Sequence, residues 1–104
     1  MKFGLLIPLA FPYATRAFVE RLGTLAEAHG FDSLWIGEHV VIPTVLTSEY
    51  PVSDDGQLPS AVRYGELDPW TTICFLAAVT QRIRLGACTI VPQRNPVYSA
   101  KEAA

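Results

Sequence analysis

The alternation of short apolar runs with a helical pattern constrains the fold more than any other feature of this sequence. An apolar run at 3–9 is followed, from Phe18 to Leu25, by apolar side chains at the three- and four-residue steps of one helix face. Gly30 ends that pattern, and a second apolar run, SLWIG at 33–37, begins after two further residues. A β-α-β unit with so short a link favours a parallel pair of strands, which places the chain in the α/β class.

Capping signals predict where the helices begin. Thr15 is a suitable capping residue for the first helix. The Asp-Pro pair at 68–69 and the Asn-Pro pair at 95–96 each combine a capping residue with proline at the first helical position. Between these pairs we expect a helix at 69–81 and a third strand at 82–91. The order β-α-β-loop-α-β-loop-α is typical of a parallel sheet covered by helices.

A long segment at about 40–67 interrupts this alternation. It contains three prolines, two glycines and the turn-forming run SDDG at 53–56. We expect a loop with one helical turn, inserted within a single domain that spans 1–104. A loop of that length in a compact domain is usually functional.

Composition excludes several classes of function. Half of the 104 residues are hydrophobic, 17% are charged and the formal net charge is −2, so the basic excess of a nucleic-acid-binding protein is absent. No apolar run approaches the roughly 18 residues that span a bilayer. The N-terminus begins like a signal peptide, but Pro8 and Pro12 interrupt its apolar run, which favours a first strand. Cys74 and Cys88 are predicted to be buried, reduced thiols rather than a disulfide or a metal site, which suits a cytoplasmic protein.

Glu38 and His39 are the strongest candidates for a site, because they directly follow the second predicted strand. Ligands of parallel α/β folds bind beyond the carboxyl ends of the strands. The chain has no GxGxxG motif after its first strand, no P-loop motif and no His-x-His pair of a barrel metallohydrolase. An ionisable pair at the mouth of an apolar strand can bind a ligand or carry a proton. The alternative is structural: Glu38 binds a neighbouring loop and His39 packs beneath it.

Two long stretches resemble one known family. GFDSLWIGEHVVIP at 30–43 and ELDPWTTICFLAAVTQRIRLGACTIVPQRNPVYSAKEAA at 66–104 look like the N-terminal part of the bacterial luciferase-like monooxygenase superfamily. The similarity is closest to its coenzyme F420-dependent oxidoreductases. The motifs that occur in the same order are GFDS at 30–33, Trp35 with Glu38-His39, Asp68-Pro69, RIRLG at 82–86 and RNPV at 94–97.

The resemblance implies a fold and an activity. Members are (β/α)8 TIM barrels, of which this chain would supply the first three strands with their helices, the last helix being cut short. They transfer a hydride between coenzyme F420, or FMN, and an organic small-molecule substrate, and the FMN branch activates O2. By this resemblance His39 lies near the cofactor ring as a catalytic and cofactor-binding residue, with Glu38 in the same pocket. Cys88 and Thr89 are implied to back the ring through a cis peptide bond, against the alternative of plain strand packing.

The length of the chain limits what it can do alone. A barrel of this kind needs about 250 residues, so we expect a fragment that is inactive by itself. By this resemblance, members of the family usually bind the cofactor phosphate with residues of the later half of the barrel. The helix at 69–81 is apolar nearly all round, and the resemblance implies a homodimer through this region. Two alternatives stay open: an FMN-dependent monooxygenase and a non-catalytic flavin-binding barrel remnant.

Overall fold

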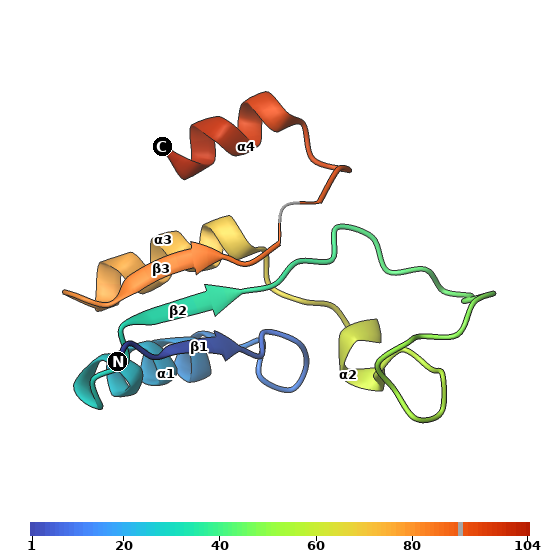
Figure 1. Ribbon diagram of the computed structural model, residues 1–104, viewed down its shortest axis with the longest axis horizontal. Helices are drawn as coiled ribbons and strands as arrows, with labels where there is room; N and C mark the ends of the chain where they lie inside the picture. The colour runs from blue at the N-terminus through green and yellow to red at the C-terminus, as the bar shows by residue number, and fades with distance from the viewer. Residues whose placement is uncertain (90) are drawn as a thin grey trace.

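The fold is built on a three-stranded parallel sheet. The structure, a computed structural model, describes residues 1–89 and 91–104 (Figure 1). The strands are β1 (Gly4–Ile7), β2 (Ser33–Ile36) and β3 (Arg84–Ala87), in the order β1-β2-β3. Both pairs are parallel, as predicted from the short link between the first two strands and from the alternation of strands and helices. All three strands therefore end at the same edge of the sheet.

Four helices accompany the strands, and three of them begin at the predicted capping residues. They are α1 (Arg16–Ala28), α2 (Ser60–Arg63), α3 (Pro69–Val79) and α4 (Pro96–Ala103). The side chains of Thr15, Asp68 and Asn95 accept hydrogen bonds of 3.3, 2.9 and 2.9 Å from backbone N–H groups two or three residues further on. The helix α2 is the single helical turn expected within the long loop. None of the helices in the described ranges is long and apolar enough to cross a membrane.

The core lies between one face of the sheet and the helices α1 and α3. Both helices lie on the same side of the strands in Figure 1. Leu34 and Ile36 of β2 are completely buried against this layer. Val19 of α1 and Leu76 of α3 pack in the same cluster. The buried residues of α1 are Val19, Gly23 and Ala26, with Phe18 and Leu22 half-buried beside them. Leu25 of the predicted stripe is exposed, so the face that covers the sheet is displaced by about one residue from that stripe.

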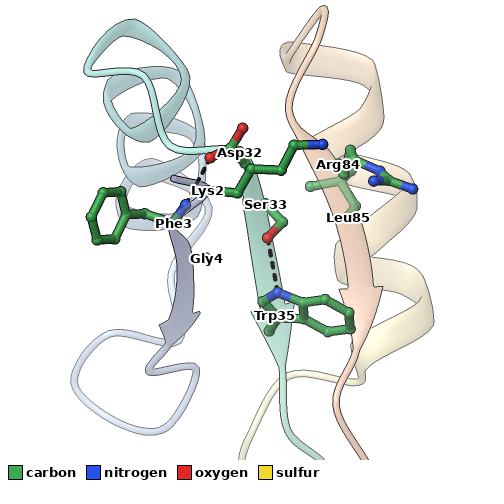
Figure 2. A pocket seen from close by; sticks show the side chains of 8 residues that line it. All are labelled: Lys2, Phe3, Gly4, Asp32, Ser33, Trp35, Arg84 and Leu85. Carbon is green, nitrogen blue, oxygen red and sulfur yellow. Dashed lines mark hydrogen bonds between the residues drawn. The ribbon is translucent and has the colours of Figure 1, made fainter.

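The opposite face of the sheet is open, and Trp35 dominates it (Figure 2). The indole Nε1 donates a 2.9 Å hydrogen bond to the Ser33 hydroxyl. The ring lies over Gly4 of β1 and Gly86 of β3, where a Cβ atom would approach Trp35 atoms to 2.8 and 2.9 Å. Trp35 remains 42% exposed, because the side chains of this face have no helix above them.

Two expectations about the third strand and the cysteines are wrong. The strand covers Arg84–Ala87 rather than 82–91, because its partner β2 ends at Ile36, whose carbonyl accepts the last bond, from the Cys88 N–H at 2.8 Å. Residue 90 lies outside the described residues. Cys74 and Cys88 are free, as predicted, but both are exposed rather than buried. Cys88 lies beyond the last paired residue of β3, and Cys74 lies on the side of α3 away from the core.

Glu27 ties the end of α1 to the turn before β3. Its carboxylate accepts hydrogen bonds from three successive backbone N–H groups: Gln81 at 3.0 Å, Arg82, and Ile83 at 2.8 Å. These bonds, chiefly that from Ile83, hold the pKa of Glu27 below its ordinary value. The carboxylate thus satisfies a row of donors at the point where the chain enters β3.

We predict that Glu27→Gln destabilises the fold in a pH-dependent way. An amide oxygen is a weaker acceptor than a carboxylate, so the thermal midpoint should fall by a few degrees at pH 7. Because the folded state lowers the pKa, the stabilisation is present above the unfolded pKa of about 4.3 and is lost as pH falls through the folded pKa. Thermal melts of wild type and variant from pH 7 to pH 3 should therefore converge. A constant difference across this range would contradict the role assigned to the charge.

Candidate functional site

An apolar groove lies at the carboxyl ends of β1 and β2. Its volume is about 590 Å³. The end of β1 and the loop after it form one wall, and α2 contributes to the other. The residues that line it are Leu6, Ile7, Pro8, Leu9, Ala10, Phe11, Tyr13, Gly37, His39, Ala61, Val62 and Glu66. The groove is large enough for part of an aromatic ligand, and two ionisable side chains face it beside Tyr13.

His39 and Glu66 form a hydrogen-bonded pair at this groove. The distance between His39 Nδ1 and Glu66 Oε2 is 2.8 Å. The Glu66 side chain is 19% exposed and the His39 side chain 42% exposed, so the carboxylate is the more enclosed partner. An imidazole that is held at one ring nitrogen by a carboxylate keeps the other nitrogen for a ligand.

The backbone around Glu66 is tied to the end of β1. Glu66 forms an isolated antiparallel bridge with Ala10. The N–H of Leu67 donates to the carbonyl of Leu9 at 3.2 Å. The returning end of the long loop therefore pairs with the segment that follows β1, and from this position the Glu66 side chain reaches His39, beyond the end of β2.

Glu38 faces a different partner, Arg94. Both Nε and Nη2 of Arg94 lie 2.5 Å from Glu38 Oε1. The same guanidinium donates to Asp68 Oδ2, and its Nη1 lies 3.8 Å from Glu102 Oε2. The Glu38 side chain is only 4% exposed, which makes it the most buried carboxylate of this cluster. One arginine thus joins the end of β2, the cap of α3 and the helix α4.

The charges of this cluster are mutually stabilised. The hydrogen bond to Glu38, reinforced by Asp68, raises the pKa of Arg94 despite partial burial, so the guanidinium stays protonated. Burial works against ionisation of Asp68, but the Thr71 N–H and the Arg94 guanidinium outweigh it and lower its pKa. Asp68 therefore serves two structural purposes, as the cap of α3 and as a partner of Arg94.

The predicted pair Glu38 and His39 is close in space but divided in its contacts. Both residues line a smaller cavity of about 320 Å³, together with Glu66, Asp68 and Arg94 among others. Of Glu38 and His39, only His39 also lines the larger groove. The structural alternative considered for Glu38, a bond to a neighbouring loop, matches its contact with Arg94, whereas His39 keeps its ring partly accessible.

Cys88 and Thr89 lie at the end of β3 and are exposed. Their side chains are 3.6 Å apart, between Sγ and Oγ1. Neither lines the groove or the smaller cavity. The cis bond expected between them is not found: within the described ranges the only cis peptide bond is Phe11–Pro12. The bond from Thr89 to residue 90 lies outside the described residues.

Glu66 is the residue of this site that the sequence did not reveal. It lies 27 residues after His39, at the far end of a loop with no regular spacing. The only local signal is its position two residues before the capping Asp68. Arg94 belongs to the RNPV motif, but the motif does not predict its contact with Glu38, because that contact depends on how the loop after β3 folds back.

A third hollow, of about 360 Å³, lies at the amino ends of the strands (Figure 2). Lys2 and Arg84 are at its rim, and Asp32 accepts a 2.7 Å hydrogen bond from the Phe3 N–H. In barrel enzymes this end of the strands contributes to stability and the carboxyl end to catalysis. Among the residues that the structure describes, no three His, Cys, Asp or Glu side chains gather as a metal site would require.

Comparison with known proteins gives a consistent family assignment. A family model described as luciferase-like monooxygenase matches residues 1–104. An uncharacterised protein of Mycobacterium tuberculosis and one of Mycobacterium bovis are each 34% identical to the chain over 105 residues. These alignments cover 100% of this chain and 36% of each relative, so the chain spans about a third of the length of the curated relatives it matches.

We predict that Arg94→Ala destabilises the protein by about 3 kcal/mol, because Glu38 would be left buried without its partner. Urea unfolding, followed by circular dichroism, measures the loss. Arg16→Ala is the matched control, since Arg16 forms an exposed pair with Glu20 at 3.7 Å and should change stability little. An equal loss in the two variants would contradict the anchoring role of Arg94.

Proposed function

Because the chain belongs to the luciferase-like monooxygenase family, we propose that it forms the N-terminal part of a (β/α)8 barrel oxidoreductase. The parallel sheet would be the first three strands of that barrel, within one domain that carries the 40–67 loop as an insertion. The complete enzyme would transfer a hydride between coenzyme F420 and an organic small molecule. We place this enzyme in the cytoplasm, where free thiols such as Cys74 and Cys88 persist.

The observation that carries this proposal is the position of His39. It is an imidazole at the edge of an apolar groove, beyond the carboxyl end of a central parallel strand, and a carboxylate holds it at Nδ1. Such a group can exchange a proton with a bound ring or substrate at neutral pH. Its place beyond the strand end is where barrel enzymes bind their ligands.

The groove suits the ring of a deazaflavin or flavin. Apolar walls from β1 and α2 would contact the faces of a planar heterocycle, and His39 would supply a polar contact at its edge. Among the described side chains that line the groove there is no lysine or arginine, so we expect another part of the protein to hold the cofactor phosphate. When bound, the cofactor supplies the hydride chemistry. This chain would supply orientation, exclusion of water and a proton at His39.

The other predicted site residues take supporting places in this proposal. Glu38 would hold the end of β2 in place through its contact with Arg94. That contact would also restrict the backbone position of His39, the next residue. Cys88 and Thr89 do not line the groove, so from the end of β3 they would contact only a part of the ligand that extends beyond it. Their exposure leaves them free to contact a ligand.

An FMN-dependent monooxygenase is the second candidate, favoured by the description of the matching family. The groove and His39 suit either ring, so the distinction must come from the cofactor itself. Deazaflavin and flavin differ in their absorption spectra. The spectrum of the complete protein, purified with its bound cofactor, would separate the two hypotheses.

We predict that His39→Ala in the complete protein lowers the rate of hydride transfer by about 10²-fold or more, because general acid–base groups contribute on that scale. Stopped-flow absorbance of the cofactor measures this rate. His29→Ala is the control, because His29 lies at the far end of α1, where its Nδ1 bonds the Leu25 carbonyl at 2.8 Å. An unchanged rate in the His39 variant would end the proposal of a catalytic role.

A homodimer through α3 is also part of the proposal. This helix is apolar nearly all round, yet Cys74, Ala77 and Ala78 remain exposed on the side away from the core. Small side chains on this side would allow close approach of a second subunit.

We predict that Ala78→Glu converts the complete protein to a monomer, because a charge would be buried in an apolar interface. Light scattering coupled to size-exclusion chromatography measures the mass. Ala100→Glu, on the exposed side of α4, should leave the mass unchanged. A dimeric Ala78→Glu protein would exclude α3 as the interface.

A further inference from the structure

The hydrogen bond between His39 and Glu66 has a defined direction. An ionised carboxylate has acceptors only, so the proton of this bond must be on His39 Nδ1. The Nδ1···Oε2 distance of 2.8 Å is typical of a charge-assisted hydrogen bond. A neutral imidazole carries one proton. Neutral His39 is therefore the tautomer with Nδ1 protonated and a lone pair on Nε2.

That tautomer is not the one that a free imidazole side chain favours. In water the Nε2–H form of histidine predominates, so a specific partner is needed to reverse the preference. Within the described residues, no hydrogen bond forms at His39 Nε2, and the side chain is 42% exposed beside the groove. The atom left for a ligand is therefore Nε2, which accepts a proton or, once protonated, donates one.

Glu66 is held in place independently of His39. Its backbone is fixed by the bridge to Ala10 and by the adjacent bond from Leu67 to Leu9. Its side chain is 19% exposed, so few other orientations are open to it. The carboxylate consequently acts as a fixed acceptor against which the imidazole is oriented, rather than as a surface charge that follows the histidine.

We propose that Glu66 is a positioning residue that holds His39 in the Nδ1–H tautomer, so that Nε2 exchanges the proton with a ligand in the groove. This inference rests on the proposed function for its catalytic meaning, but the tautomer itself is a property of the protein without any ligand. It assigns a task to the end of the 40–67 loop: this segment completes the site by supplying the acceptor.

The remaining ionisable groups near His39 have other partners or other places. Glu38, Asp68 and Arg94 share the smaller cavity with it, and Arg94 neutralises both carboxylates. Tyr13, from the loop after β1, lines the groove but contacts the ring of Phe18, at a centroid distance of 4.9 Å. Glu66 is thus the group whose removal should change the state of the imidazole.

The tautomer can be measured by NMR in the complete protein labelled with ¹⁵N in histidine. Above the titration of the imidazole, wild-type His39 should show a protonated Nδ1 and an unprotonated Nε2 in the ¹⁵N chemical shifts. Glu66→Leu removes the acceptor and should shift the population toward the Nε2–H form. Glu66→Gln should restore much of the wild-type pattern, because its amide oxygen can accept the same bond. The spectrum of His39→Ala assigns the signals.

His29 is an internal control in the same spectra. Its Nδ1 bonds a backbone carbonyl, also an acceptor only, so its shifts should be the same in wild type and in every Glu66 variant. Unchanged His39 shifts in Glu66→Leu would overturn the inference. So would a wild-type spectrum in which His39 is already the Nε2–H tautomer. If the Leu variant does not fold, the Gln variant and the wild-type spectrum still decide the point.

Kinetics separates this inference from the proposed function. If Glu66 acts through His39, Glu66→Leu should lower kcat by a factor approaching the roughly 10²-fold that a general acid–base group contributes, with little change in cofactor Kd. In the His39→Ala background, the same change should add almost nothing. An equal loss in both backgrounds would contradict a role through His39. The NMR and kinetic results can also differ. If the His39 tautomer depends on Glu66 but His39→Ala does not change the rate of hydride transfer, the proposed function is overturned and the role of Glu66 in positioning His39 stands.

Discussion

The central position of β2 determines the arrangement of the charged groups at the carboxyl end of the sheet. This strand is paired on both edges, and its inward side chains, Leu34 and Ile36, are completely buried. Its end is therefore one of the most fixed points of the molecule. Glu38 and His39 follow after Gly37, so the burial of Ile36, two and three residues earlier, limits where their backbone can lie. The contacts of Glu38 with Arg94 and of His39 with Glu66 both begin from this point.

The adjacent residues Glu38 and His39 contact different parts of the molecule. Glu38 joins Arg94, and so ties β2 to the segment after β3 and to the cap of α3. His39 joins Glu66, and so ties β2 to the segment that extends β1. Glu38 thus stabilises the fold through its ion pair, whereas His39 keeps its Nε2 available for a ligand. This division explains how a buried, fully paired carboxylate and a half-exposed imidazole can occur next to each other.

The features that the sequence predicts well are those determined by neighbouring residues. The caps Thr15, Asp68 and Asn95 could be located because each needs only a polar side chain before a helical pattern. The parallel pairing followed from the length of a link. The partner of His39 could not be found this way, because it depends on where a long irregular loop returns. The exposure of the two cysteines was missed because an apolar stretch does not specify which of its residues face the sheet.

Trp35 illustrates a constraint of another kind. Its indole covers Gly4 on one neighbouring strand and Gly86 on the other, at positions where no Cβ fits. Side chains alternate along a strand, so a shift of two residues would bring Lys2 or Leu6 to the place of Gly4, and Arg84 or Cys88 to that of Gly86. Either shift collides with the ring. One side chain therefore constrains the register of both neighbouring strands, and the same register aligns the strand ends from which the site is built.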